Sequence, residues 1–163
     1  MKTPRSMRGR QSYGIVDSPA GPISFATDDE SVTAIWLGKR RKADPRPSSL
    51  ARETRDQLRA YIRGRRHEFD LPLALDLPAF TARVLAEVES IPWGEAKSYG
   101  EVALLVGSPG AARAVGQAMG ANPLPIVIPC HRVVAAQQRL GGFGGGLKWK
   151  RWLLDHEGVK YRA

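Results

Sequence analysis

The sequence predicts a two-part fold, with a small α/β unit over residues 1–77 and a mainly helical unit over residues 78–163. Short β-rich runs separated by turn signals fill the first third of the chain. After Leu77 they give way to short amphipathic helices punctuated by glycine and proline. The 163 residues are 42% hydrophobic, which is enough to bury a core in a chain of this length.

Three strands are expected to open the first unit as an antiparallel meander, because β-rich runs alternate with turns at residues 11–17, 22–28 and 31–37. Residues 1–10 hold four basic residues and no acid, which predicts a basic arm outside the fold. A basic, proline-broken loop follows the strands. A helix capped by Ser48 or Ser49 then ends at Gly64. Residues 69–77 alternate apolar and acidic positions like an edge strand.

The second unit is expected to contain four helices, at residues 78–90, 99–106, 110–119 and 147–156. Ser98 and Glu101 form a capping box for the second of them. Ser108 and Pro109 are placed to cap and start the third. Two short helices joined by a tight glycine-containing turn are typical of a helix-turn-helix, and also of ordinary helical hairpins.

The single cysteine, Cys130, is the main candidate for chemistry. It follows a short apolar run that is expected to be a strand, within the segment NPLPIVIPCHRVV. A lone cysteine is either an inert core residue or a nucleophile. His131 and Arg132 favour the second interpretation, because a base and a positive charge promote thiolate formation. Adjacent side chains on an extended segment face opposite ways, so His131 is expected to reach the sulfur through a turn or a bridging water.

A basic histidine works better when an acid orients it, and the sequence leaves six acids open for that role: Glu87, Glu89, Glu95, Glu101, Asp155 and Glu157. Glu157 stands at the end of the last helix, where the helix dipole disfavours a carboxylate. Its position therefore hints at a specific partner.

The glycine-rich segment GGFGGG at residues 141–146 does not match a phosphate-binding loop or a dinucleotide site. Its glycines leave the main chain open to a flat ligand or to another segment. One cysteine permits neither an internal disulfide nor a multi-cysteine zinc site. Neither kind of site is therefore expected.

The chain is strongly basic, with 25 Lys and Arg against 16 Asp and Glu, a formal net charge of +9 and a pI near 10.2. Such a balance favours a polyanionic partner such as nucleic acid. No apolar run approaches the length of a membrane span, and residues 1–10 lack the apolar stretch of a secretory signal. We therefore expect an intracellular, cytoplasmic protein without membrane contact.

Six short motifs in order resemble the O6-alkylguanine-DNA alkyltransferases, the methylated-DNA--protein-cysteine methyltransferases. The hexapeptide IPCHRV around Cys130 is similar to the active-site signature of that family. The resemblance is strong from residue 78 to residue 158 and only general before it. The other matching segments are SYGEVA (98–103), AARAVG (111–116), NP (122–123), the glycine loop (141–146) and WLLDHEG (152–158).

This resemblance implies an N-terminal domain similar to ribonuclease H and a helical domain with a winged helix-turn-helix-like motif that binds the minor groove of duplex DNA. The recognition helix would run from residue 111 to 119, with small residues that suit a narrow groove: Ala111, Ala112, Ala114 and Gly116. Arg113 would replace the damaged nucleotide in the base stack, and Tyr99 would help to rotate it out.

The chemistry implied by the resemblance is transfer of an alkyl group from O6-alkylguanine onto Cys130, with O4-alkylthymine left open as a second substrate. His131, oriented by Glu157, would take the thiol proton through water, Asn122 would order the turn, and Tyr99 would donate a proton to the base. The expected pocket residues are Met119, Pro125, Val133, Phe143 and Gly144. The protein would act once, as a monomer and without a cofactor.

Two departures from the family are visible. Phe143 stands where some relatives have tyrosine, so no hydroxyl bond is assigned there. His67 is the only histidine of the first unit, which has no cysteine, so the zinc site of some relatives cannot form. Three other functions remain alternatives: a lesion-binding relative, which carries tryptophan at the cysteine position, a cysteine hydrolase, and a helix-turn-helix regulator.

Overall fold

The structure, a computed structural model, describes residues 9–162. The chain divides into two compact units, Met1–Asp76 and Leu77–Ala163. Most of the basic arm expected at residues 1–10 lies outside the described residues. Within the described part, no helix is long and apolar enough to cross a membrane.

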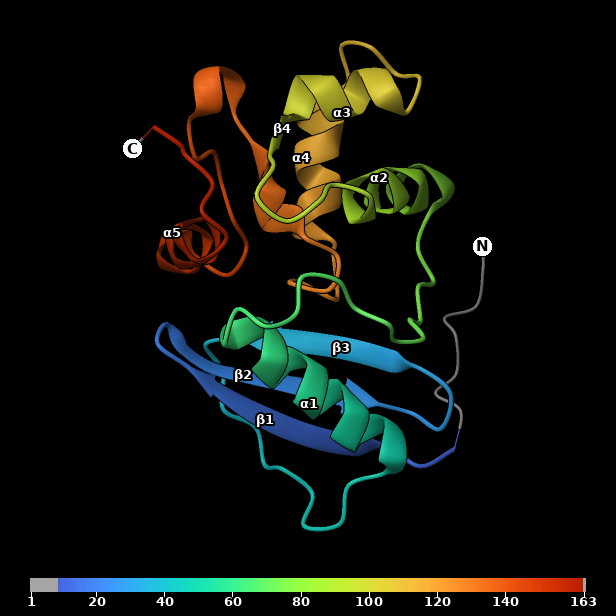
Figure 1. The fold of residues 1–163 in the computed structure, drawn as a ribbon. Helices are drawn as coiled ribbons and strands as arrows, with labels where there is room; N and C mark the ends of the chain where they lie inside the picture. Colours follow the sequence, from blue (N-terminus) through green and yellow to red (C-terminus); the bar gives the residue numbers. More distant parts are fainter. Residues whose placement is uncertain (1–8, 163) are drawn as a thin grey trace. The chain divides into compact units, whose positions relative to one another are not determined.

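The first unit is a three-stranded antiparallel sheet in the order β1-β2-β3, built from β1 (Ser12–Ser18), β2 (Gly21–Thr27) and β3 (Val32–Leu37). Helix α1 (Ser49–Ile62) lies across one face of this sheet (Figure 1). The hydroxyl of Ser48 caps the helix by accepting a hydrogen bond from the Ala51 N–H at 3.1 Å. The expected meander and helix are confirmed.

The core of this unit needs a glycine opposite a large ring. Gly14 on β1 pairs with Phe25 on β2, and the Phe25 ring turns over the glycine. A Cβ atom on Gly14 would lie 2.2 Å from Cζ of Phe25, so no larger residue fits without moving the ring. Phe25, Ile23 and Leu58 of α1 are all buried and belong to the core from which water is excluded.

The expected edge strand over residues 69–77 is wrong in extent. Only Leu73 pairs with β3, in parallel with Val32, through hydrogen bonds from the Val32 N–H to the Pro72 carbonyl and from the Ala74 N–H to the Val32 carbonyl. Pro72 has no N–H to extend the ladder. The side chain of Gln57 on α1 binds the Asp70 backbone in both directions, at 3.0 and 2.9 Å, and so replaces a strand partner.

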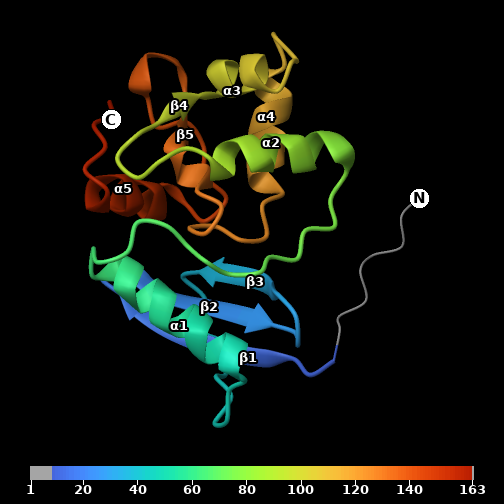
Figure 2. The same cartoon turned by 45° about the vertical axis from the view of Figure 1, so that its right-hand side comes forward.

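The second unit is mainly helical (Figure 2), with elements α2 (Ala79–Glu89), β4 (Lys97–Ser98), α3 (Tyr99–Leu105), α4 (Ala112–Gly120), η1 (Cys130–Arg132), β5 (Val133–Val134), η2 (Ala136–Gln138) and α5 (Leu147–His156). Helices α3 and α4 pack against each other and both pack against α2. This arrangement confirms the predicted helical hairpin and the mainly helical second unit.

A short parallel pairing of β4 with β5 was not predicted. Lys97 pairs with Val133 and Ser98 with Val134. The pairing joins the start of α3 to the residues that directly follow η1. Two segments more than thirty residues apart thereby lie side by side; one leads directly into Tyr99, and the other begins three residues after Cys130.

The two serine caps predicted in this unit differ in outcome. At α3 the capping box is present, because the Ser98 hydroxyl accepts from the Glu101 N–H at 3.1 Å and the Glu101 carboxylate accepts from the Ser98 N–H at 3.0 Å. Helix α4 instead begins at Ala112, after Ala111 and without a side-chain cap. Ser108 serves the end of α3, where its N–H binds the Ala103 carbonyl.

The first prediction compares these two serines. Ser98→Ala removes a cap hydroxyl and should lower the free energy of unfolding by about 1 kcal/mol. Ser108→Ala removes a hydroxyl that caps no helix, so its effect should stay within about 0.5 kcal/mol. Urea unfolding monitored by circular dichroism measures both values. Equal losses would contradict the assignment of the cap to Ser98.

Candidate active site

Cys130 is the first residue of the 3-10 turn η1 and only 6% of it is exposed. The preceding apolar run forms turns instead of the expected strand, and the Cys130 N–H binds the Ile128 carbonyl at 2.8 Å. Because the chain turns tightly at the cysteine, the opposite-face argument for His131 does not apply. The turn directs the side chains of residues 130–132 by helical geometry.

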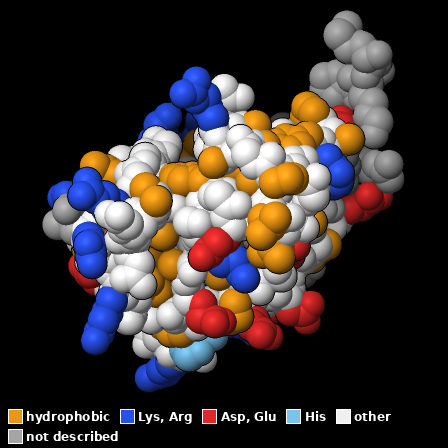
Figure 3. Space-filling view, turned by 90° about the horizontal axis from the view of Figure 1, so that it is seen from above, with side chains coloured by type: hydrophobic (Ala, Val, Ile, Leu, Met, Phe, Trp, Pro, Cys, Tyr) orange, Lys and Arg blue, Asp and Glu red, His pale blue; other side chains and the backbone are white. Residues whose placement is uncertain are grey.

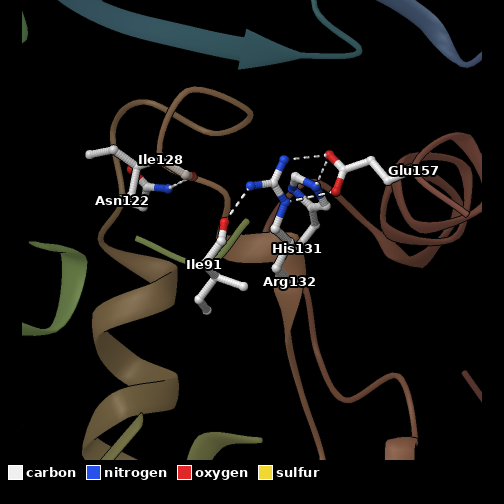
Figure 4. A network of polar contacts seen from close by, with 6 residues as sticks. All are labelled: Ile91, Asn122, Ile128, His131, Arg132 and Glu157. Carbon is white, nitrogen blue, oxygen red and sulfur yellow. Dashed lines mark hydrogen bonds and ion pairs between the residues drawn. The ribbon is translucent and has the colours of Figure 1, made fainter. Parts of the chain in front are cut away.

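Asn122 fixes the turn that leads to Cys130. Its Nδ2 donates to the Ile128 carbonyl at 2.9 Å (Figure 4). Its Oδ1 accepts from the Leu124 N–H at 2.9 Å. Between these anchors Ile126 is buried and has a φ of 76°, a left-handed conformation that costs a β-branched residue about 1–3 kcal/mol. The bonds of Asn122 help to hold this strained turn.

A buried carboxylate links the two residues that follow the cysteine. Glu157, the C-cap residue of α5, accepts from His131 Nε2 at 2.7 Å and from Arg132 Nε and Nη2 at 2.7 and 3.0 Å. Arg132 Nη1 also donates to the Ile91 carbonyl at 2.6 Å (Figure 4). The network therefore ties together η1, the end of α5 and the segment after α2.

The network fixes the protonation of the imidazole. Since the carboxylate accepts at Nε2, that nitrogen carries the proton, and the lone pair of neutral His131 is on Nδ1. Nδ1 is buried and has no hydrogen-bond partner among the described residues. His131 can therefore accept a proton at Nδ1 while Glu157 stabilises the resulting imidazolium.

The pKa values agree with this assignment. Burial lowers the pKa of His131 and so favours the neutral ring, whereas the hydrogen bond and the charge of the Glu157 carboxylate act in the opposite direction. Burial alone would raise the pKa of Glu157, but the hydrogen bonds and charges of His131 and Arg132 lower it to about 2. Near neutral pH the pair therefore consists of a neutral imidazole and a carboxylate.

The thiol is protonated at rest. Burial raises the pKa of Cys130 to about 11, while the Asn122 side chain, the charge of Lys150 and nearby backbone N–H groups act in the opposite direction. A thiol in such a site needs a base to become a nucleophile. The lone pair on the neighbouring His131 supplies one.

Tyr99, the first residue of α3, is a candidate acid. Its hydroxyl donates to the Gly142 carbonyl at 3.4 Å. Burial and the charge of the Cys130 sulfur raise its pKa, so the phenol keeps its proton. A half-buried hydroxyl beside the thiol can donate a proton to a bound base.

A pocket of about 530 Å³ opens onto these groups and is lined by Tyr99, Ala112, Arg113, Gly116, Met119, Gly120, Cys130, Gly142, Phe143 and Gly144. Helix α4 and the glycine loop at residues 141–146 both contribute to its lining, and Cys130 lies in its wall. Four of the residues assigned to DNA or to the base from the sequence do not line it: Ala111, Ala114, Pro125 and Val133. Among residues 9–162, no group of three or more His, Cys, Asp or Glu is placed to hold a metal.

The structure agrees with the acid that the resemblance implied, and it changes the role of one cation. Glu157 is the carboxylate that meets His131. Arg132, expected to promote the thiolate, instead binds Glu157 with its guanidinium, because a planar fork fits a carboxylate with two hydrogen bonds.

Lys150 was missed by the sequence analysis, although it is completely buried near the thiol. Its position in the sequence could have identified it as a candidate. Lys150 stands three and four residues before Leu153 and Leu154, so it shares the buried face of α5 with them. A lysine in such an apolar stripe is uncommon and indicates a specific partner.

Comparisons with known proteins agree with this site. Residues 79–159 match the family model "6-O-methylguanine DNA methyltransferase, DNA binding domain", and residues 12–75 match the ribonuclease-like domain of the same enzymes. A methylated-DNA--protein-cysteine methyltransferase of Mycobacterium tuberculosis is 42% identical over 151 residues, which cover 89% of this chain and 91% of that one. The constitutive enzyme of Bacillus subtilis is 34% identical over 160 residues, with 92% and 97% covered.

Solved structures agree as well. The crystal structure of Mycobacterium tuberculosis OGT in complex with DNA has a TM-score of 0.81 at 43% identity, and the match covers 90% of this chain and 92% of that one. The O6-methylguanine methyltransferase of the same organism has a TM-score of 0.80 at 40% identity, with 94% and 96% covered. The predicted two-domain fold, ribonuclease-like and then DNA-binding, is thereby confirmed. The chain belongs to the methylated-DNA--protein-cysteine methyltransferase family.

Proposed function

We propose that this protein repairs DNA directly, by moving an alkyl group from O6 of a guanine onto the sulfur of Cys130. The observation that carries the proposal is the pocket with Cys130 in its wall, next to a histidine that a buried carboxylate orients. The methyltransferase relatives and the relative crystallised with DNA support the same activity.

The reaction begins with proton transfer from the thiol. His131 takes the Cys130 proton at Nδ1 through a bridging water, and Glu157 stabilises the imidazolium at Nε2. Arg132 keeps the carboxylate in place and ionised. Asn122 holds the turn that presents the sulfur.

The thiolate then displaces the guanine in one step. The bond from sulfur to the alkyl carbon forms while the bond from that carbon to O6 breaks, and the electron pair leaves with the guanine. Tyr99 donates a proton to the departing base, since its phenol is protonated and lines the pocket. Phe143, Met119 and the open backbone at Gly144 surround the base.

The product on Cys130 is a thioether. It has no carbonyl carbon for water to attack, so the same site has no route to hydrolyse it. Each molecule therefore repairs one lesion and is then spent. The same chemistry extends to O4-alkylthymine, whose alkyl carbon is likewise bound to an exocyclic oxygen.

We place the DNA on α4, through the minor groove. The first half of this helix carries the small, half-buried residues Ala112, Ala114 and Gly116 around Arg113, and a narrow groove admits a helix most readily where its side chains are short. Arg113 is exposed and lines the pocket, and it is the one long side chain between Ala111 and Gly116 that is free of the core. It would fill the stack when the damaged nucleotide turns into the pocket.

The charge of the surface suits a polyanion. On the face shown in Figure 3, Lys and Arg side chains gather mainly along one side, apart from most of the Asp and Glu side chains. Contacts between such cations and phosphates release counterions and bind duplexes without sequence preference.

The nucleophile, the base and the pocket all belong to one unit of one chain. We therefore propose that the protein acts as a monomer, in the cytoplasm where DNA is accessible.

The second prediction tests transfer itself. After incubation with one equivalent of duplex containing O6-methylguanine, intact-protein and peptide mass spectrometry should show the mass of one methylene added to the Cys130 peptide, and no turnover beyond one equivalent. Cys130→Ser should stay unmodified and still retard the damaged duplex in a gel. A wild-type protein that binds the duplex but gains no mass would be a lesion-binding module.

The third prediction concerns nucleotide flipping. Arg113→Ala should slow methyl transfer from duplex DNA far more than transfer from the free O6-alkylguanine base, because only the duplex requires extrusion. Arg151→Ala removes an equal charge from an exposed position of α5 outside the pocket, and serves as the control. Equal losses of the two rates in Arg113→Ala would rule out the stacking role.

The fourth prediction concerns the carboxylate. Glu157→Gln keeps the side-chain shape but removes the charge that stabilises the imidazolium, so the rate of methyl transfer should fall by at least about tenfold. Glu89→Gln changes an exposed acid of α2 and should have no effect on that rate. Single-turnover kinetics with the damaged duplex gives both rates. A Glu157→Gln rate equal to wild type would assign the base elsewhere.

A further inference from the structure

Lys150 on α5 is 0% exposed, and no step of the proposed reaction uses it. Removing an ammonium from water costs several kcal/mol unless hydrogen bonds or a counter-charge compensate. Among the described residues, the Lys150 ammonium forms no ion pair with a carboxylate. Its charge is therefore not cancelled locally, which calls for another explanation of its burial.

Two backbone carbonyls receive this ammonium. Nζ donates to the Val133 carbonyl at 2.8 Å and to the Gly142 carbonyl at 3.0 Å. Val133 directly follows η1, and Gly142 belongs to the glycine loop that lines the pocket. One side chain thus joins the segment that follows the nucleophile to the glycine loop of the pocket lining.

Tyr99 belongs to the same cluster. Its hydroxyl donates to the Gly142 carbonyl that Lys150 also binds, and the Lys150 Nζ lies 5.7 Å from the centre of the Tyr99 ring. A cation at this distance is attracted to the ring face. The position of the proposed acid therefore depends on the carbonyl that Lys150 holds.

The ionisable groups that face Lys150 are Cys130 and His131 from η1 and Tyr99 from α3. The charge of Lys150 lowers the pKa of Cys130, against the burial that raises it. Burial in turn lowers the pKa of Lys150 to about 8, while a Cys130 thiolate raises it. Near neutral pH the lysine is charged. Its charge stabilises the Cys130 thiolate relative to the neutral thiol.

We propose that Lys150 is a positioning residue for alkyl transfer. Its buried ammonium binds the carbonyls of Gly142 and Val133 and so holds the glycine loop against the segment that follows η1. The same ammonium supplies a positive charge that stabilises the Cys130 thiolate. The inference rests on the proposed function only in taking Cys130 as the nucleophile. Its charge component can be tested with a small electrophile in the absence of DNA.

A lysine that only braces the backbone predicts a different pH dependence. A neutral amine retains two N–H donors and can still bind both carbonyls, so a purely structural role does not change when the lysine loses its proton. The electrostatic role is present below the pKa of Lys150 and is lost as the pH rises through about 8. The ratio of wild-type to variant reactivity against pH separates the two.

The fifth prediction uses the rate of Cys130 alkylation by iodoacetamide, followed by mass spectrometry from pH 6.5 to 9.5. Lys150→Met and Lys150→Gln should react about tenfold more slowly than wild type near pH 7, since one unit in the pKa of the thiol changes the thiolate population tenfold. The deficit should shrink above pH 8. Lys148→Met, an equal charge change at an exposed position of the same helix, should match wild type throughout.

The two Lys150 variants separate charge from hydrogen bonding. Gln has two N–H donors for the carbonyls but no charge, whereas Met has neither. Circular dichroism and thermal unfolding establish that each is folded; if Lys150→Met does not fold, Lys150→Gln carries the comparison. Equal rates for Lys150→Gln and wild type at pH 7, or a deficit that stays constant with pH, would overturn the electrostatic role.

The positioning role of Lys150 at Gly142 is tested by the rate of alkyl transfer from free O6-alkylguanine base at pH 9.5, where the lysine of the wild-type protein is largely neutral. Lys150→Met should transfer the alkyl group more slowly than Lys150→Gln, because only Gln can bind the Gly142 carbonyl. Equal rates would overturn the positioning role. If iodoacetamide gives the expected pH pattern while wild-type protein gains no alkyl group from damaged DNA, the charge of Lys150 is supported and the proposed transfer fails.

Discussion

The carboxylate of Glu157 is the group on which the geometry of the site depends. Three donors from two adjacent residues, His131 and Arg132, meet its two oxygens inside the second unit. Removing this one acid would leave a guanidinium buried without a counter-charge and an imidazole without a fixed tautomer. The acid also stands at a helix C-terminus, which is electrostatically unfavourable, so the arginine offsets both its burial and its location.

The second unit buries three charged side chains, and each joins segments that are distant in sequence. Arg132 connects η1 to Ile91 and to Glu157, while Lys150 connects α5 to β5 and to the glycine loop. Apolar residues of the same size could fill this volume at lower electrostatic cost. Apolar residues would not fix the orientation of the joined segments in the same way. A dispersion contact depends little on direction, whereas a hydrogen bond requires its donor and acceptor to be aligned.

Local rules predicted the elements that depend on near neighbours. The capping box of Ser98 and Glu101 spans four residues and formed as expected, and so did the meander of the first unit. Ser108 satisfied the same local rule for a cap, yet it ends α3 instead of starting α4. Whether Ser108 ends α3 or starts α4 depended on the hydrogen bond that closes the turn after α3, from the Ser108 N–H to the Ala103 carbonyl. Similarly, residues 69–77 kept a strand pattern but formed only a bridge, because Gln57 took the backbone of Asp70.

The sequence by itself determined that Cys130 and His131 are neighbours, that the chain is basic, and that small residues follow Ala111, since these are properties of order and composition. Motif order also identified the family. The residue pattern left six acids open for His131, and the family resemblance pointed to Glu157. Only the tertiary structure decided that Arg132 serves that acid and not the thiol, and that Lys150 is buried beside the pocket. These contacts span eight to forty-one residues and depend on side-chain direction at α5 and η1. Periodicity in a single sequence does not encode which helix face meets which turn, because that is set by the packing of the whole unit.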